Sequence, residues 1–416
     1  MYLAGGARGA GLRGGSLRRV ATGNVVALGT VSLLTDVSSE MVTAILPAYL
    51  VLGLHLSMVQ YGALDGLYTG ATALTRLVGG YLADRFRRRK TVALVGYGLS
   101  TVSKLGLLGA SSAVGIGAVI AVDRTGKGLR TAPRDALIAH SVPEADLGQA
   151  FGVHRAMDAA GAFLGPVAAL ALLALAGTTD YSVVFVGSLC AGILGVVVLT
   201  LFVREPPTAA QPAMPGAEPV LSPTGRLQAR RLLRAGGFRR LCAVAALLGL
   251  VTVGDGFVYL VLQDRDDLPV RAFPLLAVGT SLAFLLLAVP LGRLADRVGR
   301  WPVVVVGYGC LLAVYLLLSS DAGPLWLVLA LYGAFYAATD GVLPALAVPL
   351  LPEALRTTGL ALLQTGQALA YVVSSVVFGL LWQTAGVAVA CWVAAGVALV
   401  LLPCCAVLLR SPRPVR

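Results

Sequence analysis

The segment "GGYLADRFRRRK" (residues 79–90) decides the fold, because the chain repeats it as "LGRLADRVGRW" (residues 291–301). Among the positions that the two copies share, Gly80 corresponds to Gly292, Asp84 to Asp296, and Arg85 to Arg297. Each copy follows the second long apolar run of its half of the chain. The same order of elements in both halves predicts two similar bundles. Parallel repeats of this kind place a binding site between the bundles.

The composition excludes a soluble globular protein. Of the 416 residues, 57% are hydrophobic and only 12% are charged, whereas a soluble domain has about 25% charged residues. So few polar groups cannot cover the surface of a water-soluble fold of this length. The surroundings of the chain must themselves be apolar, and the sequence therefore predicts an all-α integral membrane protein.

Long apolar runs predict how often the chain crosses the membrane. A helix needs roughly 20 apolar residues to span the hydrocarbon core of a bilayer. Runs of this kind predict twelve transmembrane helices, at residues 22–53, 58–83, 89–109, 112–137, 148–177, 181–203, 239–263, 271–294, 301–320, 324–350, 356–382 and 386–409. Together with the repeat, they predict two pseudo-symmetric bundles of six helices each.

Basic residues indicate the orientation of these helices. The run at 85–90, the segment 204–240 and the run at 296–300 fall on one side, which is cytoplasmic by the positive-inside rule. We therefore expect a multi-pass protein of the cell membrane (inner or plasma membrane) with both termini in the cytoplasm. The predicted parts of the chain are a cytoplasmic arm (1–21), the first bundle (22–203), a Pro-rich cytoplasmic linker (204–238), the second bundle (239–409) and a cytoplasmic tail (410–416).

Other classes of function find no support in the sequence. The formal charge of +12 comes from basic residues in short gaps between apolar runs, so no nucleic acid is expected as a partner. The six cysteines have no C-x-x-C spacing, and we expect neither disulfides nor a metal site. The sequence has no nucleophile elbow and no Walker A loop, so we expect neither an enzyme nor a cofactor.

The repeated loop resembles the hallmark of the Major Facilitator Superfamily, G-x-L-A-D-R-x-G-R, and the resemblance extends over essentially the whole chain. The second copy keeps the last glycine of the pattern as Gly299, whereas Arg87 stands at that position in the first copy. The resemblance implies the fold of that superfamily, with two bundles that rock against each other. It also implies a cytoplasmic latch made of the six repeated residues, with Asp84 facing the start of the eleventh helix near Glu353. The alternative is that the arginines only fix the topology.

Four residues of the predicted fifth helix resemble the antiporter motif of the superfamily, G-x8-G-x3-G-P: Gly152, Gly161, Gly165 and Pro166. Two further glycines of that motif are replaced by Ala169 and Leu170. In the superfamily, this motif accompanies export. Small residues also allow close packing of helices in any membrane protein, which is the alternative interpretation.

Charged residues inside apolar runs predict the groups that couple transport to protons. Asp36 and Glu40 are four residues apart on the first helix and share a face. A charge at the centre of a bilayer costs a few kcal/mol, so these carboxylates need a water-filled cavity or a basic partner. Arg124 and Lys127 of the fourth helix are the predicted partners, and Asp123 beside them is predicted to line the cavity.

A second group of titratable residues lies on the fifth helix, where His154 and Asp158 share a face. Histidine is the side chain that ordinarily titrates close to neutral pH, so this pair predicts a proton site. A structural pair that braces the cytoplasmic gate is the alternative. Arg130, Arg134 and Asp135 lie closer to the cytoplasmic end of the fourth helix and are expected to serve the latch and the topology.

Isolated polar residues in the second half predict the substrate cavity. Two carboxylates and three tyrosines lie inside apolar runs there: Asp255, Asp340, Tyr259, Tyr332 and Tyr336. Aromatic side chains with few charges favour an amphipathic organic substrate, although the tyrosines could equally pack in the core. Lys104, near the outer end of its helix, is expected to extend its amine to the membrane surface.

These observations predict a secondary active transporter that works by alternating access. Proton-coupled efflux of a small organic molecule is the leading hypothesis, and an uptake symporter or facilitator for a metabolite or ion is the alternative. A membrane enzyme or a receptor is disfavoured. The expected partners are a small-molecule substrate, protons and membrane lipids, and we expect the chain to act as a monomer.

Overall fold

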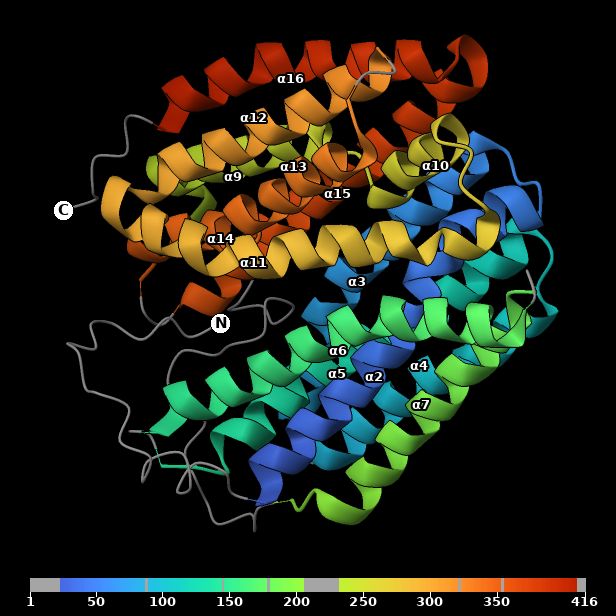
Figure 1. Ribbon diagram of the computed structural model, residues 1–416. Helices are drawn as coiled ribbons and strands as arrows, with labels where there is room; N and C mark the ends of the chain where they lie inside the picture. Colours follow the sequence, from blue (N-terminus) through green and yellow to red (C-terminus); the bar gives the residue numbers. More distant parts are fainter. Residues whose placement is uncertain are drawn as a thin grey trace. The chain divides into compact units, whose positions relative to one another are not determined.

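The computed structural model describes residues 23–86, 89–143, 146–177, 180–205, 232–320, 323–352 and 355–409. Within these ranges the chain forms helices joined by short connections, without a β-strand (Figure 1). The side chains of residues 76–88, 357 and 409 lie outside this description.

The first part of the chain forms six long helices (Figure 1). They are α2 (Gly23–Ala48, continued by a π-helical turn, Tyr49–Gly53), α3 (Met58–Phe86), α4 (Arg89–Gly109), α5 (Ala113–Ala139), α6 (Leu147–Ala176) and α7 (Ser182–Phe202).

The second part repeats this pattern with two interrupted helices. It contains α9 (Gly236–Val251), α10 (Asp255–Arg265), α11 (Pro274–Val298), α12 (Arg300–Ser319), α13 (Leu325–Thr339), α14 (Val342–Ala347), α15 (Arg356–Ala385) and α16 (Val387–Leu409). The helices α9 and α10 form one span, and α13 and α14 form another.

Length and composition make this a multi-pass membrane protein. In the described part of the chain, 10 helical segments are long and apolar enough to cross a bilayer. Two further helices, α3 with 29 residues and α5 with 27, are also of spanning length. The number of charged residues in α5 explains why its apolar character is weaker. These segments together agree with the twelve helices expected from the sequence.

Packing divides the chain into two compact units. Within the described residues, unit 1 consists of residues up to 43, 75–110 and 121–212, and unit 2 of residues 44–74, 111–120 and 213–416. Parts of α2, α3 and α5 thus pack with the later helices, and the units differ from the two halves of the sequence. The domain boundaries drawn from the repeat remain a prediction.

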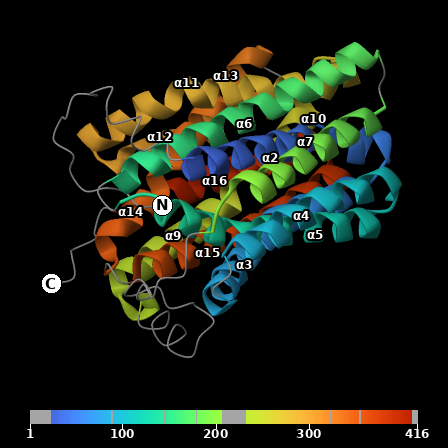
Figure 2. The same ribbon diagram turned by 90° about the horizontal axis from the view of Figure 1, so that it is seen from below.

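Each unit has its own helix contacts. In unit 1, α4 packs along α7, and α6 also contacts α7 (Figure 2). In unit 2, α9 packs against α15, α11 against α13, and α12 against both α13 and α16.

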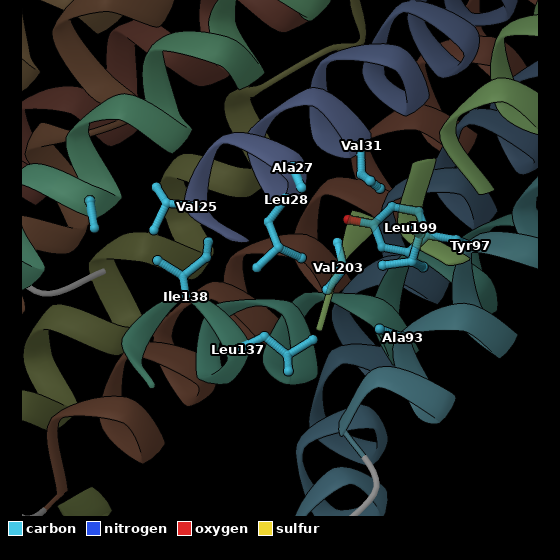
Figure 3. Packing of buried hydrophobic residues seen from close by; sticks show 11 residues of the cluster. Val25, Ala27, Leu28, Val31, Ala93, Tyr97, Leu137, Ile138, Leu199 and Val203 are labelled. Carbon is cyan, nitrogen blue, oxygen red and sulfur yellow. The ribbon is translucent and has the colours of Figure 1, made fainter. Parts of the chain in front are cut away.

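A buried apolar cluster holds the helices of unit 1 together (Figure 3). Leu28 of α2, Tyr97 of α4, Leu137 of α5 and Leu199 of α7 are completely or almost completely buried in it. Because lipid is as apolar as these side chains, close van der Waals packing stabilises such contacts more than the hydrophobic effect does.

Candidate functional site

Asp123 of α5 is the centre of a buried triad of charges in unit 1. Its carboxylate accepts hydrogen bonds from Lys104 of α4 and from Arg124, whose Nε lies 2.7 Å from Oδ2. Lys104 and Asp123 are only 3% and 7% exposed. The expectation that Lys104 extends to the membrane surface is therefore wrong, because a carboxylate of the neighbouring helix lies within its reach. Asp123 therefore binds these two cations, and its carboxylate is not exposed to an open cavity.

Asp36 of α2 pairs with Arg130 of α5, at a distance of 3.7 Å. The guanidinium of Arg130 also lies 4.4 Å from the centre of the Tyr97 ring and is almost completely buried. Arg124, the partner expected from the sequence, is engaged by Asp123, six residues or about 9 Å earlier along the helix. Arg130 was expected to serve only the cytoplasmic end of the helix, but its burial against Asp36 makes it part of the charge network.

Lys127 lies between these two ion pairs along α5. The charges of both Asp36 and Glu40 act on its amine. The structure thus brings together the acidic face of α2 and the basic face of α5, as the sequence suggested, but with a shifted set of partners.

A third group of charges surrounds Asp158 of α6. His154 Nε2 lies 3.5 Å from Asp158 Oδ1, and His154 is 1% exposed. Ser32 of α2 donates a hydrogen bond to the same carboxylate. Arg134 Nη1 donates a hydrogen bond of 3.2 Å to Ser32 Oγ and lies 4.0 Å from Asp158 Oδ2. The same guanidinium also donates hydrogen bonds to Asp135. Arg134 therefore belongs to this group as well as to the end of α5.

Two glycines of the antiporter-like motif bring α6 against the acidic face of α2. A Cβ atom on Gly161 would lie 3.1 Å from the Cβ of Asp36, and one on Gly165 would lie 2.6 Å from the Cβ of Glu40. Gly152 differs, because a Cβ atom there would meet no atom of the described residues within 4 Å. Close approach of the helices therefore depends on the second and third glycines of the motif, and the first has no such role.

In unit 2, the span formed by α9 and α10 is interrupted at residues 252–254. Tyrosine side chains satisfy the backbone groups that the break exposes. The Tyr315 hydroxyl donates to the carbonyl of Val251 at 2.7 Å and accepts from the N–H of Val253 at 3.0 Å. Tyr332 donates to the carbonyl of Val253 at 3.0 Å. Non-helical backbone at membrane depth requires partners of this kind inside the protein.

The residues predicted to line a cavity are only partly brought together at this break. Asp255 begins α10 and accepts a hydrogen bond of 3.2 Å from Tyr336, whose hydroxyl lies 3.4 Å from that of Tyr332. Tyr259 is buried one turn further along α10. Asp340 follows the last residue of α13 and is exposed, so its position gives no support to a role in the same group.

One polar residue at the break was missed by the sequence analysis. Asp65 of α3 accepts hydrogen bonds of 2.7 Å from both Tyr371 and Ser375 of α15. Its carboxylate lies against the backbone of Gly254, where a Cβ atom would come within 2.7 Å of Oδ2. The signal that could have found it is a single carboxylate inside an apolar run, since ionisable residues within a span are functional candidates by default.

Comparison with known proteins gives the family of the chain. Residues 28–280 and 265–416 match the profile of the Major Facilitator Superfamily. The chain belongs to this superfamily. An uncharacterised MFS-type transporter of Methanocaldococcus jannaschii is 31% identical over 373 residues, which cover 86% of this chain and 88% of that protein. An uncharacterised protein of Mycobacterium tuberculosis is 34% identical over 154 residues, or 37% of each chain.

Solved structures of the superfamily share the fold at low identity. The nucleoside transporter NupG has a TM-score of 0.78 and 15% identity, covering 93% of this chain and 99% of NupG. A POT family transporter in complex with 5-aminolevulinic acid has a TM-score of 0.73 and 14% identity, covering 92% and 95% of the two chains. Membership of the superfamily makes the chain a secondary transporter and not an enzyme.

The structure describes the side chains of the superfamily's repeated loop in the second copy only. Three residues of the expected latch, Gly80, Asp84 and Arg85, lie outside the side chains that the structure describes, and so does Glu353, near which Asp84 was expected to lie. In the second copy, Gly292, Asp296 and Arg297 occupy the last turns of α11, and both charged residues are exposed. Gly299 then ends the helix with a φ of +97°, a conformation that favours glycine.

Proposed function

We propose that this transporter exports a small organic molecule in exchange for protons. The observation that carries the proposal is the contact of Gly161 and Gly165 with Asp36 and Glu40. Glycines of a motif that resembles the antiporter motif thus adjoin carboxylates that can bind a proton. A helix contact of this kind links proton binding to the position of α6 against α2.

The chemistry of exchange requires a group whose partner changes when it is protonated. Asp36 holds Arg130 at 3.7 Å while it is ionised, and a protonated Asp36 would release that guanidinium. His154 and Asp158 offer a second proton acceptor in the same unit. Lys127, near both Asp36 and Glu40, allows the network to redistribute charge. Substrate and proton can then compete for the same few groups, which antiport requires.

The proposed substrate is a small amphipathic organic molecule. Asp255, Tyr332 and Tyr336 supply a carboxylate and two aromatic hydroxyls next to the interrupted helix, and such mixed surfaces suit a ligand of that kind. A gradient of one pH unit provides about 1.4 kcal/mol per proton. The membrane potential adds about 2.3 kcal/mol per charge per 100 mV.

The remaining parts of the proposal concern orientation and assembly. We infer a monomer in the cell membrane. We also infer that both termini lie in the cytoplasm, because the basic residues gather on the side that carries them. Asp84 and Asp296, the carboxylates of the repeated loop, act as the cytoplasmic latch that closes between transport steps.

Transport in proteoliposomes tests the proposal. The purified protein is reconstituted, a pH gradient of either direction is imposed, and the accumulation of labelled nucleosides, peptides, amino acids, organic cations and drugs is measured. Antiport predicts accumulation when the lumen is acidic, because protons then leave as substrate enters. Accumulation driven by an acidic exterior indicates symport, and equilibration without a gradient effect indicates a facilitator. Either of these results overturns the proposal. Protein-free liposomes are the control.

A further inference from the structure

Asp65 of α3 is held by hydroxyl groups in unit 2. Tyr371 and Ser375 of α15 each donate a hydrogen bond of 2.7 Å to its Oδ2. Ser375 is completely buried, and Asp65 is partly buried. The two hydrogen bonds from α15 therefore fix the position of this carboxylate.

The other side of this site is the break between α9 and α10. The backbone of Gly254 lies directly against the carboxylate of Asp65. The next residue, Asp255, carries a second carboxylate, which Tyr336 of α13 binds at 3.2 Å. The two carboxylates interact electrostatically, and Tyr61 of α3 is a further titratable group beside them. The break therefore joins two acidic groups from different helices.

No cation accompanies these two acids in the part of the chain that the structure describes. Among the described side chains, no lysine, arginine or histidine nitrogen lies within 4.0 Å of the carboxylate of Asp65 or of Asp255. In unit 1, by contrast, Asp36, Asp123 and Asp158 each have such a nitrogen within that distance. Neighbouring carboxylates in a medium of low polarity do not both remain ionised without a cation, and a proton is the smallest ligand that relieves their repulsion.

Hydroxyl partners allow this carboxyl to exist in both protonation states. A tyrosine hydroxyl donates to an ionised carboxylate and accepts from a protonated one. Asp65 can therefore gain and lose a proton without leaving Tyr371 unpaired. Protonation of Asp123 would instead deprive Lys104 and Arg124 of the carboxylate that they share.

We propose that Asp65 is a further proton-binding carboxyl of this transporter, in addition to the carboxylates of unit 1. The hydroxyls of Tyr371 and Ser375 can bond to either of its states, and Asp255 is the neighbouring carboxylate. The proton comes from water and returns to water, so the step needs no further reactant. Its use in driving export rests on the proposed function, whereas the binding of the proton does not.

Infrared difference spectroscopy of the purified full-length protein tests proton binding, with the proton itself as the probe. Spectra are recorded during a pH titration in water and in deuterium oxide, in the region of the C=O stretch of protonated carboxyl groups. The wild type is expected to show a titrating band that is lost in Asp65→Asn and retained in Asp36→Asn. Tyr371→Phe removes one hydrogen bond, so the band should keep its amplitude and move to higher frequency.

An unchanged titration in Asp65→Asn overturns the proposal, as does a band that Tyr371→Phe leaves in place. Size-exclusion chromatography shows whether Asp65→Asn folds. If it does not, the test is the carboxyl band in Tyr371→Phe and Ser375→Ala: a shift supports the proposal, and an unshifted band overturns it. The two proposals fail separately. Transport without a pH effect refutes proton-driven export even if Asp65 titrates. Conversely, pH-driven transport with an unchanged proton-to-substrate ratio in Asp65→Asn refutes the coupling role of Asp65.

Discussion

Gly165 of α6 lies directly against Glu40 of α2, where a Cβ atom would come within 2.6 Å of the Cβ of Glu40. Gly161 and Asp36 repeat this relationship one helical turn earlier, at 3.1 Å. The close contact between α6 and α2 therefore lies at the two carboxylate residues, Asp36 and Glu40. An added methyl group has no room at residue 165, and none at residue 161, where it would also lie 2.6 Å from the carbonyl oxygen of Leu33, unless one helix moves.

Alanine at residue 165 should separate these helices. Overpacking of a close contact costs about 1–3 kcal/mol, so Gly165→Ala should lower the melting temperature in detergent and reduce transport. Gly152→Ala is the matched control on the same helix, because a Cβ atom there meets no atom of the described chain within 4 Å and alanine favours helix. Equal effects of the two substitutions on melting and transport would show that the helix contact is unimportant.

The triad around Asp123 predicts an asymmetric response to neutralisation. Asp123→Asn removes the carboxylate that Lys104 and Arg124 share, and loss of one partner from a buried ion pair costs about 3–5 kcal/mol. Lys104→Met removes one of the two cations but leaves the pair of Asp123 with Arg124 intact. Thermal unfolding should therefore show a large loss of stability for Asp123→Asn and a small change for Lys104→Met. Similar losses for both would mean that Lys104 is the principal partner.

Tyrosine hydroxyls should stabilise the break between α9 and α10. Tyr315→Phe removes one hydrogen bond to Val251 and another from Val253, and leaves both backbone groups without that partner. The expected cost is about 1–3 kcal/mol for each unsatisfied group. Tyr308→Phe is the control, because Tyr308 is equally buried but its hydroxyl bonds side chains, those of Thr252 at 3.4 Å and of Gln367, and not the backbone of the break. A melting temperature that falls as much in the control would contradict this role.

The fold could be predicted because its signals are local. Apolar runs of spanning length and the repeat at residues 79–90 and 291–301 do not depend on which helices become neighbours. The interruption at residues 252–254 was not predicted. Its three residues, Thr252, Val253 and Gly254, carry no charge and do not interrupt the apolar run, and the tyrosines that satisfy its backbone are distant in sequence.

Partners within the site could not be predicted, because they depend on the register between helices. Asp36 pairs with Arg130 and not Arg124, a difference of six residues along α5. Lys104 lies near the end of an apolar run, where lysine ordinarily extends to the membrane surface, but Asp123 of the neighbouring helix holds it inside. Asp65 has no charged neighbour in sequence, and its partners, Tyr371 and Ser375, lie more than 300 residues away.

The pair of Asp36 and Arg130 should couple transport to protons, and a double-mutant cycle tests this. Arg130→Met leaves Asp36 without its cation, so it should abolish pH-driven transport and also reduce energy-independent exchange. Asp36→Asn should abolish only the pH-driven part. Combining the two removes both charges, and exchange should then recover toward the level of Asp36→Asn. Arg239→Met, an exposed position on α9, is the control. If the double variant exchanges no better than Arg130→Met, then Arg130 acts through its contact with Tyr97 rather than through Asp36.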